Sequence, residues 1–355
     1  MKGTEAPNNW LIACEKEGVN QAHSSDPKCR AIFYARTTSA ALSALGCFLV
    51  LFIIIVYKKY TRFTQRLIMY LLLPTFVISA ASVYPNIDDI SIPCEVAAFF
   101  MNWGTLSQRL IILCIVVHLL VFTFNQTRPK CLELLFHVVT WGLSFCFSII
   151  PIPGHHYGSA GVWCWIKGVT HYEDELRLGC FYIWVWCCVS IEIVCFTIVV
   201  VRVRRLLRRF QGMSSSNPEV EETKRRFKKY IYPLMLYPLV NFILAIPVTA
   251  NRIQNWVNEG HPVFGLFLCH SIVFPLWGFC NAMLYFMNKE TLLQLHPCNV
   301  WEGIISWRRS SSQKRQISSA SNDQAPDIDF AYAGGAVTNP SALHSATMDS
   351  ESDME

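Results

Sequence analysis

The chain has 355 residues, of which 52% are hydrophobic and only 15% are charged. Soluble domains carry about a quarter of charged residues, so long segments of this chain are expected to avoid water. The formal net charge of +5 is too small to indicate a nucleic-acid partner, and its distribution along the chain is more informative than its sum.

A helix that crosses a bilayer needs roughly 20 apolar residues, because only a helix pairs its own backbone groups in lipid. Seven windows meet this requirement, at about residues 37–57, 67–84, 95–124, 132–152, 177–201, 230–250 and 262–287. The second window is the weakest, since it is short and ends at Tyr84-Pro85. The sixth contains Pro233, Pro238 and Pro247, which predict a kink but leave it long enough to span. The windows predict an all-α membrane protein with a seven-transmembrane-helix bundle.

The distribution of Lys and Arg predicts the orientation of this bundle. Residues 1–36 contain no apolar core of the kind that a secretory signal requires, so the first window is expected to act as the insertion signal. The loops after windows 1, 3 and 5 carry clusters of Lys and Arg, whereas the other loops carry Lys167, Arg177 and Arg252. Basic loops stay in the cytoplasm. The N-terminal segment weakly opposes this pattern, but the loop charge outweighs it and predicts an N-terminus outside a plasma-membrane protein.

Four regions follow from these patterns: an extracellular segment (1–36), the seven-helix domain (37–288), a short juxtamembrane helix (289–298) and a cytoplasmic tail (299–355). The tail is rich in Ser, Ala and Asp and poor in hydrophobic residues, which predicts disorder. Cys298 is a candidate for palmitoylation. Serines that follow basic residues are candidates for receptor-kinase phosphorylation and arrestin binding, although a plain solvated tail is an equally good interpretation of any one of them. These serines are Ser310, Ser311, Ser312, Ser318 and Ser319.

The predicted topology puts four of the 15 cysteines on the oxidising side of the membrane. Cys94 opens the third helix and Cys164 lies midway between helices 4 and 5, so a disulfide between them would tether that loop over helix 3. Cys14 and Cys29 could close a short N-terminal loop. Four cysteines allow three pairings, and free thiols are the alternative for each.

Two short motifs carry a family resemblance. They are the helix 4 run 136–142 (FHVVTWG) and the following loop run 161–166, Gly-x-Trp-Cys-Trp-Ile. Together they resemble the cyclic-AMP-receptor-like family, which includes the slime-mould cyclic AMP receptors and an orphan animal branch, over about residues 35–290. The resemblance implies a G-protein-coupled receptor in which Cys164 bonds to Cys94. It also suggests cyclic AMP as one candidate ligand.

The chain departs from the larger rhodopsin-like class. Asn281 and Tyr285 keep the spacing of the Asn-Pro-x-x-Tyr switch in helix 7, but Ala282 replaces its proline. Helix 3 lacks the Asp/Glu-Arg-Tyr motif, and helix 2 lacks the acidic residue that binds sodium in that class. Helix 7 has no interior lysine for a retinal Schiff base. These differences predict a receptor outside the main class.

Arg109 in helix 3 and Glu192 in helix 5 are both expected near mid-membrane, where an ionisable residue is costly and indicates function. One interpretation is an ion pair between the two helices, which movement of helix 5 would perturb. Another is that Arg109 contacts an anionic group of a ligand through its planar fork. A charge swap would separate the two hypotheses.

Further residues are candidates for a ligand cavity or for polar contacts between helices. Helical spacing places Met101 and Thr105 on one face with Arg109. His270 and Asn281 lie on one face of helix 7, and Asn281 is expected to bond Asn241, although packing is the simpler role for each. Most tryptophans near the outer rim are interface residues, but the Cys94–Cys164 tether would make Trp165, together with Trp103, a lid over a cavity. These residues are Met101, Trp103, Thr105, Arg109, Trp165, Glu192 and His270.

Basic residues at the cytoplasmic ends of helices 5 and 6 predict a surface that faces a heterotrimeric G protein and anionic membrane lipids. The residues are Arg204, Arg205, Arg208, Lys224, Arg225 and Lys228. A small transporter or channel is the alternative function, but it would favour internal repeats and more charges along a path. No cofactor, metal cluster or nucleophile–base pair is indicated, so we do not expect an enzyme. The ligand, which is extracellular in this interpretation, is not identified by the sequence.

Overall fold

Long apolar runs fold into membrane-length helices in the computed structural model, which describes residues 14, 24, 26–83, 92–125, 131–160, 163–167, 171–212, 231–258, 262–287 and 305. In this part of the chain, seven helices are long and apolar enough to cross a membrane. The prediction of seven spanning helices is therefore confirmed.

The first three spanning helices are α2 (Pro27–Val56), α3 (Phe63–Val83) and α4 (Ile92–Asn125), with the short turn η2 (Lys59–Thr61) between the first two. The fourth consists of α5 (Leu132–His137), the π-helical turn η3 (Val138–Leu143) and α6 (Ser144–Ile149). The fifth combines α7 (His171–Arg177), the π-helical turn η4 (Leu178–Tyr182) and α8 (Ile183–Gly212). The last two are α10 (Tyr232–Val257) and α11 (Phe264–Phe286).

Several helices run beyond the apolar windows that predict them. The first begins at Pro27 rather than near residue 37, because Asp26 caps it through a 2.8 Å bond from the backbone N–H of Lys28 to its carboxylate. The sixth continues to Val257 rather than ending near residue 250. Apolar content marks the part of a helix that crosses lipid, whereas the helix itself ends where its capping residues lie.

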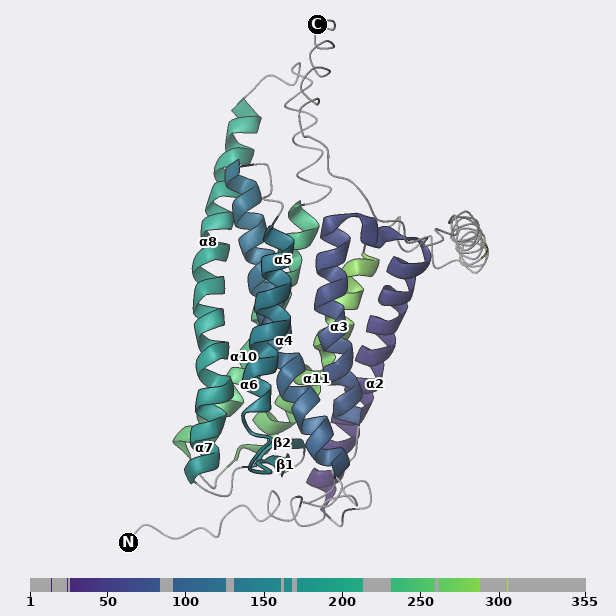
Figure 1. Cartoon of the computed structure of the whole chain (residues 1–355), viewed down its shortest axis with the longest axis vertical. Coiled ribbons are helices and arrows are strands. Elements are labelled where there is room, and N and C mark those ends of the chain that lie inside the picture. The colour runs from purple at the N-terminus through teal and green to yellow at the C-terminus, as the bar shows by residue number, and fades with distance from the viewer. Residues whose placement is uncertain are drawn as a thin grey trace, which may run out of the picture. The chain divides into compact units, whose positions relative to one another are not determined.

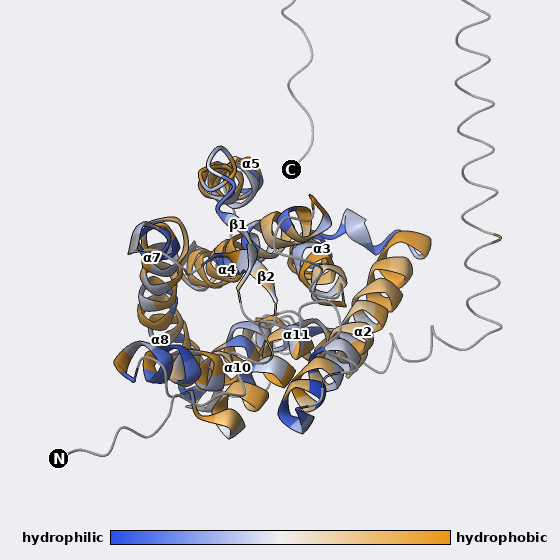
Figure 2. Ribbon diagram, turned by 90° about the horizontal axis from the view of Figure 1, so that it is seen from below, coloured by the Kyte–Doolittle hydropathy of each residue, from blue (hydrophilic) through white to orange (hydrophobic). Residues whose placement is uncertain are grey.

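The helices form a ring in which neighbours in sequence are mostly neighbours in space. α2 packs against α3 and α11, α3 against α4, α4 against α8, and α10 against α11. Figure 2, seen along the bundle, shows this ring with hydrophobic residues prevailing along the helices. In Figure 1 the helices run roughly side by side, with the β1–β2 hairpin at one end and the extension of α8 at the other.

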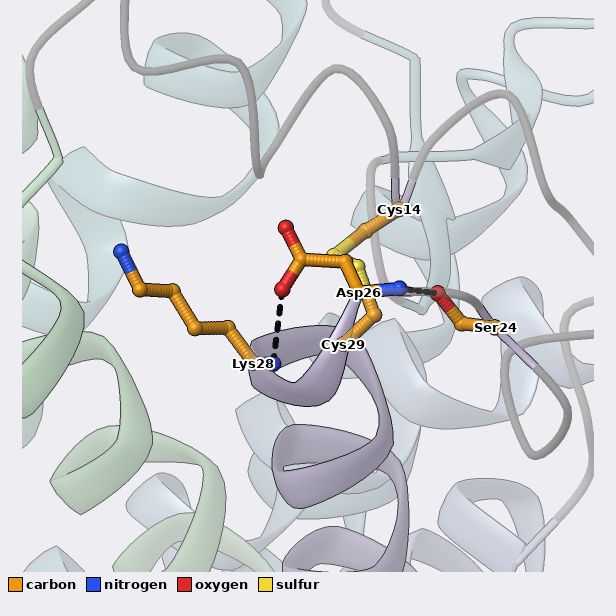
Figure 3. Close-up of a disulfide and its surroundings, with 5 residues drawn as sticks. All are labelled: Cys14, Ser24, Asp26, Lys28 and Cys29. Atoms are coloured by element: carbon orange, nitrogen blue, oxygen red, sulfur yellow. Dashed lines mark hydrogen bonds between the residues drawn. A yellow bond between two sulfur atoms is a disulfide. The ribbon is translucent and has the colours of Figure 1, made fainter.

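Two disulfides and the hairpin define one end of the bundle, which we call the disulfide end. Cys14 bonds to Cys29 in the first turn of α2, beside the capping residue Asp26 (Figure 3). Cys94 in the first turn of α4 bonds to Cys164 in β2. Both predicted pairings are confirmed. The antiparallel strands β1 (Tyr157–Ser159) and β2 (Cys164–Ile166) lie against α4.

Glycine allows α11 to approach α2 and α3 closely. A Cβ at Gly278 would meet Ser43 Oγ, would lie 2.6 Å from Cys47 Sγ and would lie 3.0 Å from Thr75 Cγ2. Small residues at helix contacts let membrane helices pack without help from the hydrophobic effect. The position therefore fixes how α11 sits against the first two spanning helices.

Candidate functional site

A cavity of about 110 Å³ lies inside the bundle and is lined by residues of α2, α3, α4, β2, the fifth spanning helix, α10 and α11. Seven of the 21 described residues in its wall are aromatic. The aromatic residues are Trp163, Trp165, Phe181, Tyr182, Trp186, Phe274 and Trp277. Such a wall suits a ligand with rings or an apolar body.

Three arginines from three different helices also line the cavity: Arg36 of α2, Arg109 of α4 and Arg252 of α10. No Asp or Glu is among the described residues that line it. Arg36 and Arg109 are 3% and 4% exposed, so their charges lie away from water. A guanidinium held in an apolar wall favours a carboxylate or phosphate, because its planar fork can bond two oxygens at once.

Aromatic rings position two of these arginines. The guanidinium of Arg109 lies over the Trp277 ring at 4.4 Å, and that of Arg252 lies over Trp163 at 5.1 Å and over Trp165 at 5.5 Å. The ring quadrupole attracts a cation on its face, and more strongly where water is excluded. The tryptophans therefore hold positive charge at the floor and near the hairpin side of the cavity.

The hairpin covers the cavity with Trp163 and Trp165. The Trp163 ring stacks on Phe267 and His270 of α11, with centroids 5.3 Å away in both pairs. The indole N–H of Trp165 donates to Asn102 Oδ1 at 3.1 Å, and Asn102 in turn donates to Ser148 Oγ at 3.2 Å. Cys164, which lies between these two tryptophans in sequence, is bonded to Cys94 and so fixes β2 to α4. Trp165 is thus buried in the cavity wall, and its role as a lid stays a prediction.

A buried tyrosine anchors the other strand of the hairpin. The Tyr157 hydroxyl donates to the backbone carbonyl of Ser148 at 2.9 Å. Burial raises the pKa of Tyr157, so the phenol keeps the proton that it donates. This bond ties β1 to the end of α6 and helps to hold the hairpin in place.

The π-helical turn η4 carries Phe181 and Tyr182 into the cavity wall, where both rings meet Trp165 edge-on at 5.1 and 5.7 Å. A π-helical turn inserts one extra residue and re-aims the side chains around it, which is why such turns recur at functional sites. Apolar periodicity does not reveal this turn, so neither residue is predicted from the sequence.

Five of the predicted residues line the cavity: Met101, Thr105, Arg109, Trp165 and His270. The other two do not. Trp103 faces the fourth spanning helix, where its ring lies 5.6 Å from that of Trp141. Glu192 is fully buried in α8.

The structure contains no hydrogen bond between Arg109 and Glu192. Neither carboxylate oxygen of Glu192 has a hydrogen-bond partner among the described residues. The same is true of Nε and Nη1 of Arg109. Arg109 packs on Trp277 instead. The direct ion pair expected as one alternative is therefore not formed in this state, whereas the second alternative, a ligand contact, agrees with the place of Arg109 on the cavity wall.

Beneath the cavity, a chain of amides joins three helices. Gln108 Nε2 of α4 donates to Asn241 Oδ1 of α10 at 3.2 Å, and Asn241 Nδ2 donates to Asn281 Oδ1 of α11 at 3.1 Å. The predicted Asn241–Asn281 bond is confirmed. Tyr285 follows one turn later on α11 and is also buried.

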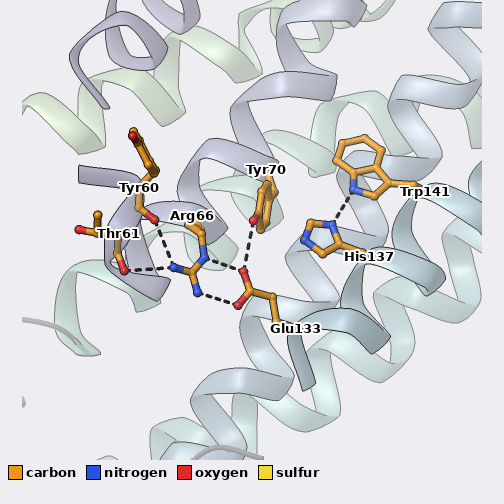
Figure 4. A network of polar contacts seen from close by, with 7 residues as sticks. All are labelled: Tyr60, Thr61, Arg66, Tyr70, Glu133, His137 and Trp141. Carbon is orange, nitrogen blue, oxygen red and sulfur yellow. Dashed lines mark hydrogen bonds and ion pairs between the residues drawn. The ribbon is translucent and has the colours of Figure 1, made fainter. Parts of the chain in front are cut away.

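The opposite end of the bundle, which we call the basic end, is held by an ion-pair network (Figure 4). Arg66 at the start of α3 bonds both carboxylate oxygens of Glu133 in α5 at 2.6 Å, and it also donates to the carbonyls of Tyr60 and Thr61. Tyr70 donates to Glu133 at 3.2 Å. A bidentate pair of this kind is the stronger form of surface ion pair. It joins the loop after α2 to the fourth spanning helix.

The predicted G-protein-facing residues are only partly described. Arg204, Arg205 and Arg208 are exposed on the extension of α8. Neighbouring Arg202 lies over the Phe124 ring at 4.0 Å, which ties α8 to the end of α4. Lys224, Arg225, Lys228, Cys298 and the five tail serines lie outside the described residues, as does the predicted juxtamembrane helix.

Sequence patterns do not predict a place in the cavity wall for Arg36, Trp163, Arg252 or Trp277. From the sequence, Arg252 is assigned to a loop, which is wrong because α10 continues to Val257. Helical spacing is the signal that could have found it, since Ala245, Val248 and Arg252 recur on one face and all line the cavity. Arg36 precedes its apolar window and resembles an interface charge, although the helix begins before it.

Comparison with known proteins gives consistent results. Residues 29–325 match the family model described as slime mold cyclic AMP receptor. Cyclic AMP receptor-like protein A of Dictyostelium discoideum is 25% identical over 81% of this chain and 70% of its own length. G-protein coupled receptor 1 of Arabidopsis thaliana is 24% identical over 75% of this chain and 81% of its own length.

Among solved structures, squid rhodopsin superposes with a TM-score of 0.60 and 14% identity, covering 77% of this chain and 87% of the rhodopsin chain. That likeness shows the fold alone, and it agrees with the ring of seven helices. The family match covers most of the chain, including the motif in the fourth spanning helix, the motif in the hairpin and the residues that line the cavity. The chain therefore belongs to the slime mold cyclic AMP receptor family, and it is a multi-pass membrane protein with the fold of a G-protein-coupled receptor.

Proposed function

We propose that the chain is a plasma-membrane receptor that binds an extracellular anionic ligand in the cavity and activates a heterotrimeric G protein at the basic end. The observation that carries this proposal is the aromatic cavity with Arg36, Arg109 and Arg252 in its wall. The most suitable ligand has one anionic group and a ring system or apolar body. Cyclic AMP, which appears in the names of three relatives, is one molecule of this kind.

The chemistry of the two ends supports an orientation with the N-terminus outside. Disulfides persist in oxidising surroundings, which favours an extracellular disulfide end and N-terminus. Lys and Arg stay on the cytoplasmic side. Lys58 and Lys59 follow the end of α2, and Arg204 and Arg205 lie in the last turns of α8, so all four are at the basic end. The hairpin and cavity would then face the outside.

Coupling would require helices 5 and 6 to rearrange at the basic end. α8 and α10 meet through Phe196 and Phe242, whose ring centroids lie 5.8 Å apart. The Arg66–Glu133 pair would meanwhile keep the ends of the second and fourth spanning helices fixed. If α8 and α10 move while the second and fourth spanning helices stay in place, a cleft opens between them at the basic end. Such a cleft would accept a G-protein helix.

The sequence of the tail, which lies outside the described residues, contains serines and a cysteine that suit a regulatory role. Phosphates on Ser310, Ser311, Ser312, Ser318 or Ser319 would create charge for an arrestin to bind, and a palmitoyl group on Cys298 would hold the juxtamembrane helix at the bilayer. The arginines of α8 would also contact anionic lipid. We include arrestin, receptor kinase and lipid as proposed partners on these grounds.

G-protein dissociation sensors in transfected cells test the proposal. Cells are exposed to cyclic AMP, other nucleotides, fatty acids, organic acids and neutral or amine compounds, and we expect a response to an anionic compound only. Arg36→Gln and Arg109→Gln should each weaken its potency roughly tenfold to a hundredfold, the range expected on losing a bond to a charged group. Arg30→Gln is the matched control, because Arg30 is exposed on the same helix as Arg36.

A response to amines that survives both cavity substitutions would contradict the anionic ligand. Solute uptake or ionic current in cells that show no G-protein response would contradict the receptor function itself. Surface staining of an N-terminal epitope on intact cells checks the orientation independently, since an epitope on the cytoplasmic side stains only after permeabilisation.

A further inference from the structure

The amide chain below the cavity contains two groups that complement one another but do not meet. Gln108, Asn241 and Asn281 are at most 1% exposed, and Asn241 is bonded on both sides. Gln108 Oε1 and Asn281 Nδ2 have no hydrogen-bond partner among the described residues. One is an acceptor and the other is a donor. Buried polar groups are rarely left unsatisfied, so two complementary ones separated by a single side chain call for an explanation.

We propose that these three residues form a two-state hydrogen-bond switch, in which Asn241 of α10 competes with a direct bond between Gln108 and Asn281. In the state described here, Asn241 bridges the other two side chains and holds α10 against α4 and α11. When α10 moves outward and takes Asn241 with it, Asn281 Nδ2 donates to Gln108 Oε1. The new bond replaces one of the two bonds that Asn241 gives up, so the buried amides recover part of what they lose and the cost of the movement falls.

The residues next to the switch lie in the cavity wall. Arg109 follows Gln108 in sequence, Trp277 precedes Asn281 by one helical turn, and Ala245 follows Asn241 by one turn; all three line the cavity. Arg109 and Trp277 are also in contact across the α4–α11 boundary. A ligand that draws Arg109 away from Trp277 would act on the same two helices that the second pairing joins.

The sequence of α10 lets this segment move. Pro238 and Pro247 lie within the helix on either side of Asn241. Each proline removes a backbone N–H donor and weakens the helix around it. The inference rests on the proposed function in one respect, because it makes the outward movement of α10 the step that would admit a G protein.

The test uses purified full-length receptor in lipid nanodiscs, with neither ligand nor G protein present. Tyr232, exposed at the start of α10, is replaced by trifluoromethylphenylalanine, and ¹⁹F NMR measures the inward and outward populations of this helix. Asn241→Leu should raise the ratio of outward to inward receptor by roughly threefold to tenfold, as expected for the loss of a hydrogen bond from one state. Ser107→Ala is the matched control, since Ser107 is buried beside Gln108 but bonds Ser144 of α6. It should leave the ratio unchanged.

The decisive variant adds Gln108→Leu to Asn241→Leu. The switch predicts that this second change moves the population back toward the inward state, because it removes a bond that exists only in the outward state. If the amides merely hold the helices together, Gln108→Leu has no bond left to remove and the ratio stays where Asn241→Leu put it, which overturns the proposal. Asn241→Ala replaces Asn241→Leu if leucine prevents folding. Because no G protein is present, failure of this test is distinct from failure of the proposed coupling.

Discussion

Single side chains decide how the cavity is closed. Asn102 is fully buried, accepts from the Trp165 indole and donates to Ser148, so one amide supports the covering hairpin from below. A buried donor that loses its acceptor keeps its desolvation cost without the compensating bond. Asn102 therefore acts on the cavity through Trp165, without lining it.

We expect Asn102→Leu to lower the free energy of unfolding by about 1–3 kcal/mol, because it leaves the Trp165 N–H buried and unpaired. Thermal unfolding in detergent, followed by a thiol-reactive dye that detects exposure of buried Cys47 and Cys114, measures the change. Adding Trp165→Phe should recover part of the loss, since it removes the unpaired donor. Ser107→Ala should cost less, because Ser144 keeps its bond to the Thr140 carbonyl. Equal costs for Asn102→Leu and Ser107→Ala would contradict this role.

A residue can be singled out in the sequence when its chemistry is costly in lipid or when it belongs to a motif. Arg109 stands out because a charge in an apolar window needs a reason, and Cys164 because it belongs to the Trp-Cys-Trp-Ile run. Trp277 gives no such signal, since a tryptophan in an apolar helix is ordinary. Its contact with Arg109 depends on how α11 is turned against α4, which local pattern does not specify.

At the scale of helices, close packing of α11 on α2 and α3 is the feature most open to test. We expect Gly278→Ala to destabilise the receptor by about 1–3 kcal/mol, the usual cost of overpacking, because its Cβ would meet Ser43, Cys47 and Thr75. Gly265→Ala is the matched control on the same helix, where a Cβ meets nothing within 4 Å. The two unfolding midpoints in one detergent give the comparison. A smaller loss at Gly278 than at Gly265 would refute the packing argument.

Helix existence and helix extent are predicted by different signals. Seven apolar windows are enough to predict seven spanning helices, because lipid leaves a chain few alternatives. They fail at the ends, where Asp26 caps α2 and where α10 runs through Arg252 to Val257. The π-helical turns η3 and η4 are also invisible, since a single inserted residue hardly changes the apolar content of its window.

Across the whole molecule, the cavity and the basic end are joined by helices that carry residues of both. α4 holds Arg109 in the cavity wall and Phe124 under Arg202 of α8 at its other end. α10 holds Arg252 near the hairpin and Asn241 in the amide chain. We propose that displacement of α10 carries a change at the cavity to the basic end, where a G protein would bind.

Nucleotide exchange on purified heterotrimeric G proteins by the receptor in nanodiscs tests this claim most directly, because it needs no known ligand. We expect basal exchange above that of empty nanodiscs with at least one G-protein class. We also expect a rise of roughly threefold to tenfold for Asn241→Leu, in proportion to the change in helix population. The contrary result has two parts: ¹⁹F NMR shows α10 displaced in Asn241→Leu, yet neither the wild-type receptor nor this variant raises exchange above that of empty nanodiscs with any G-protein class. That result would contradict coupling through α10.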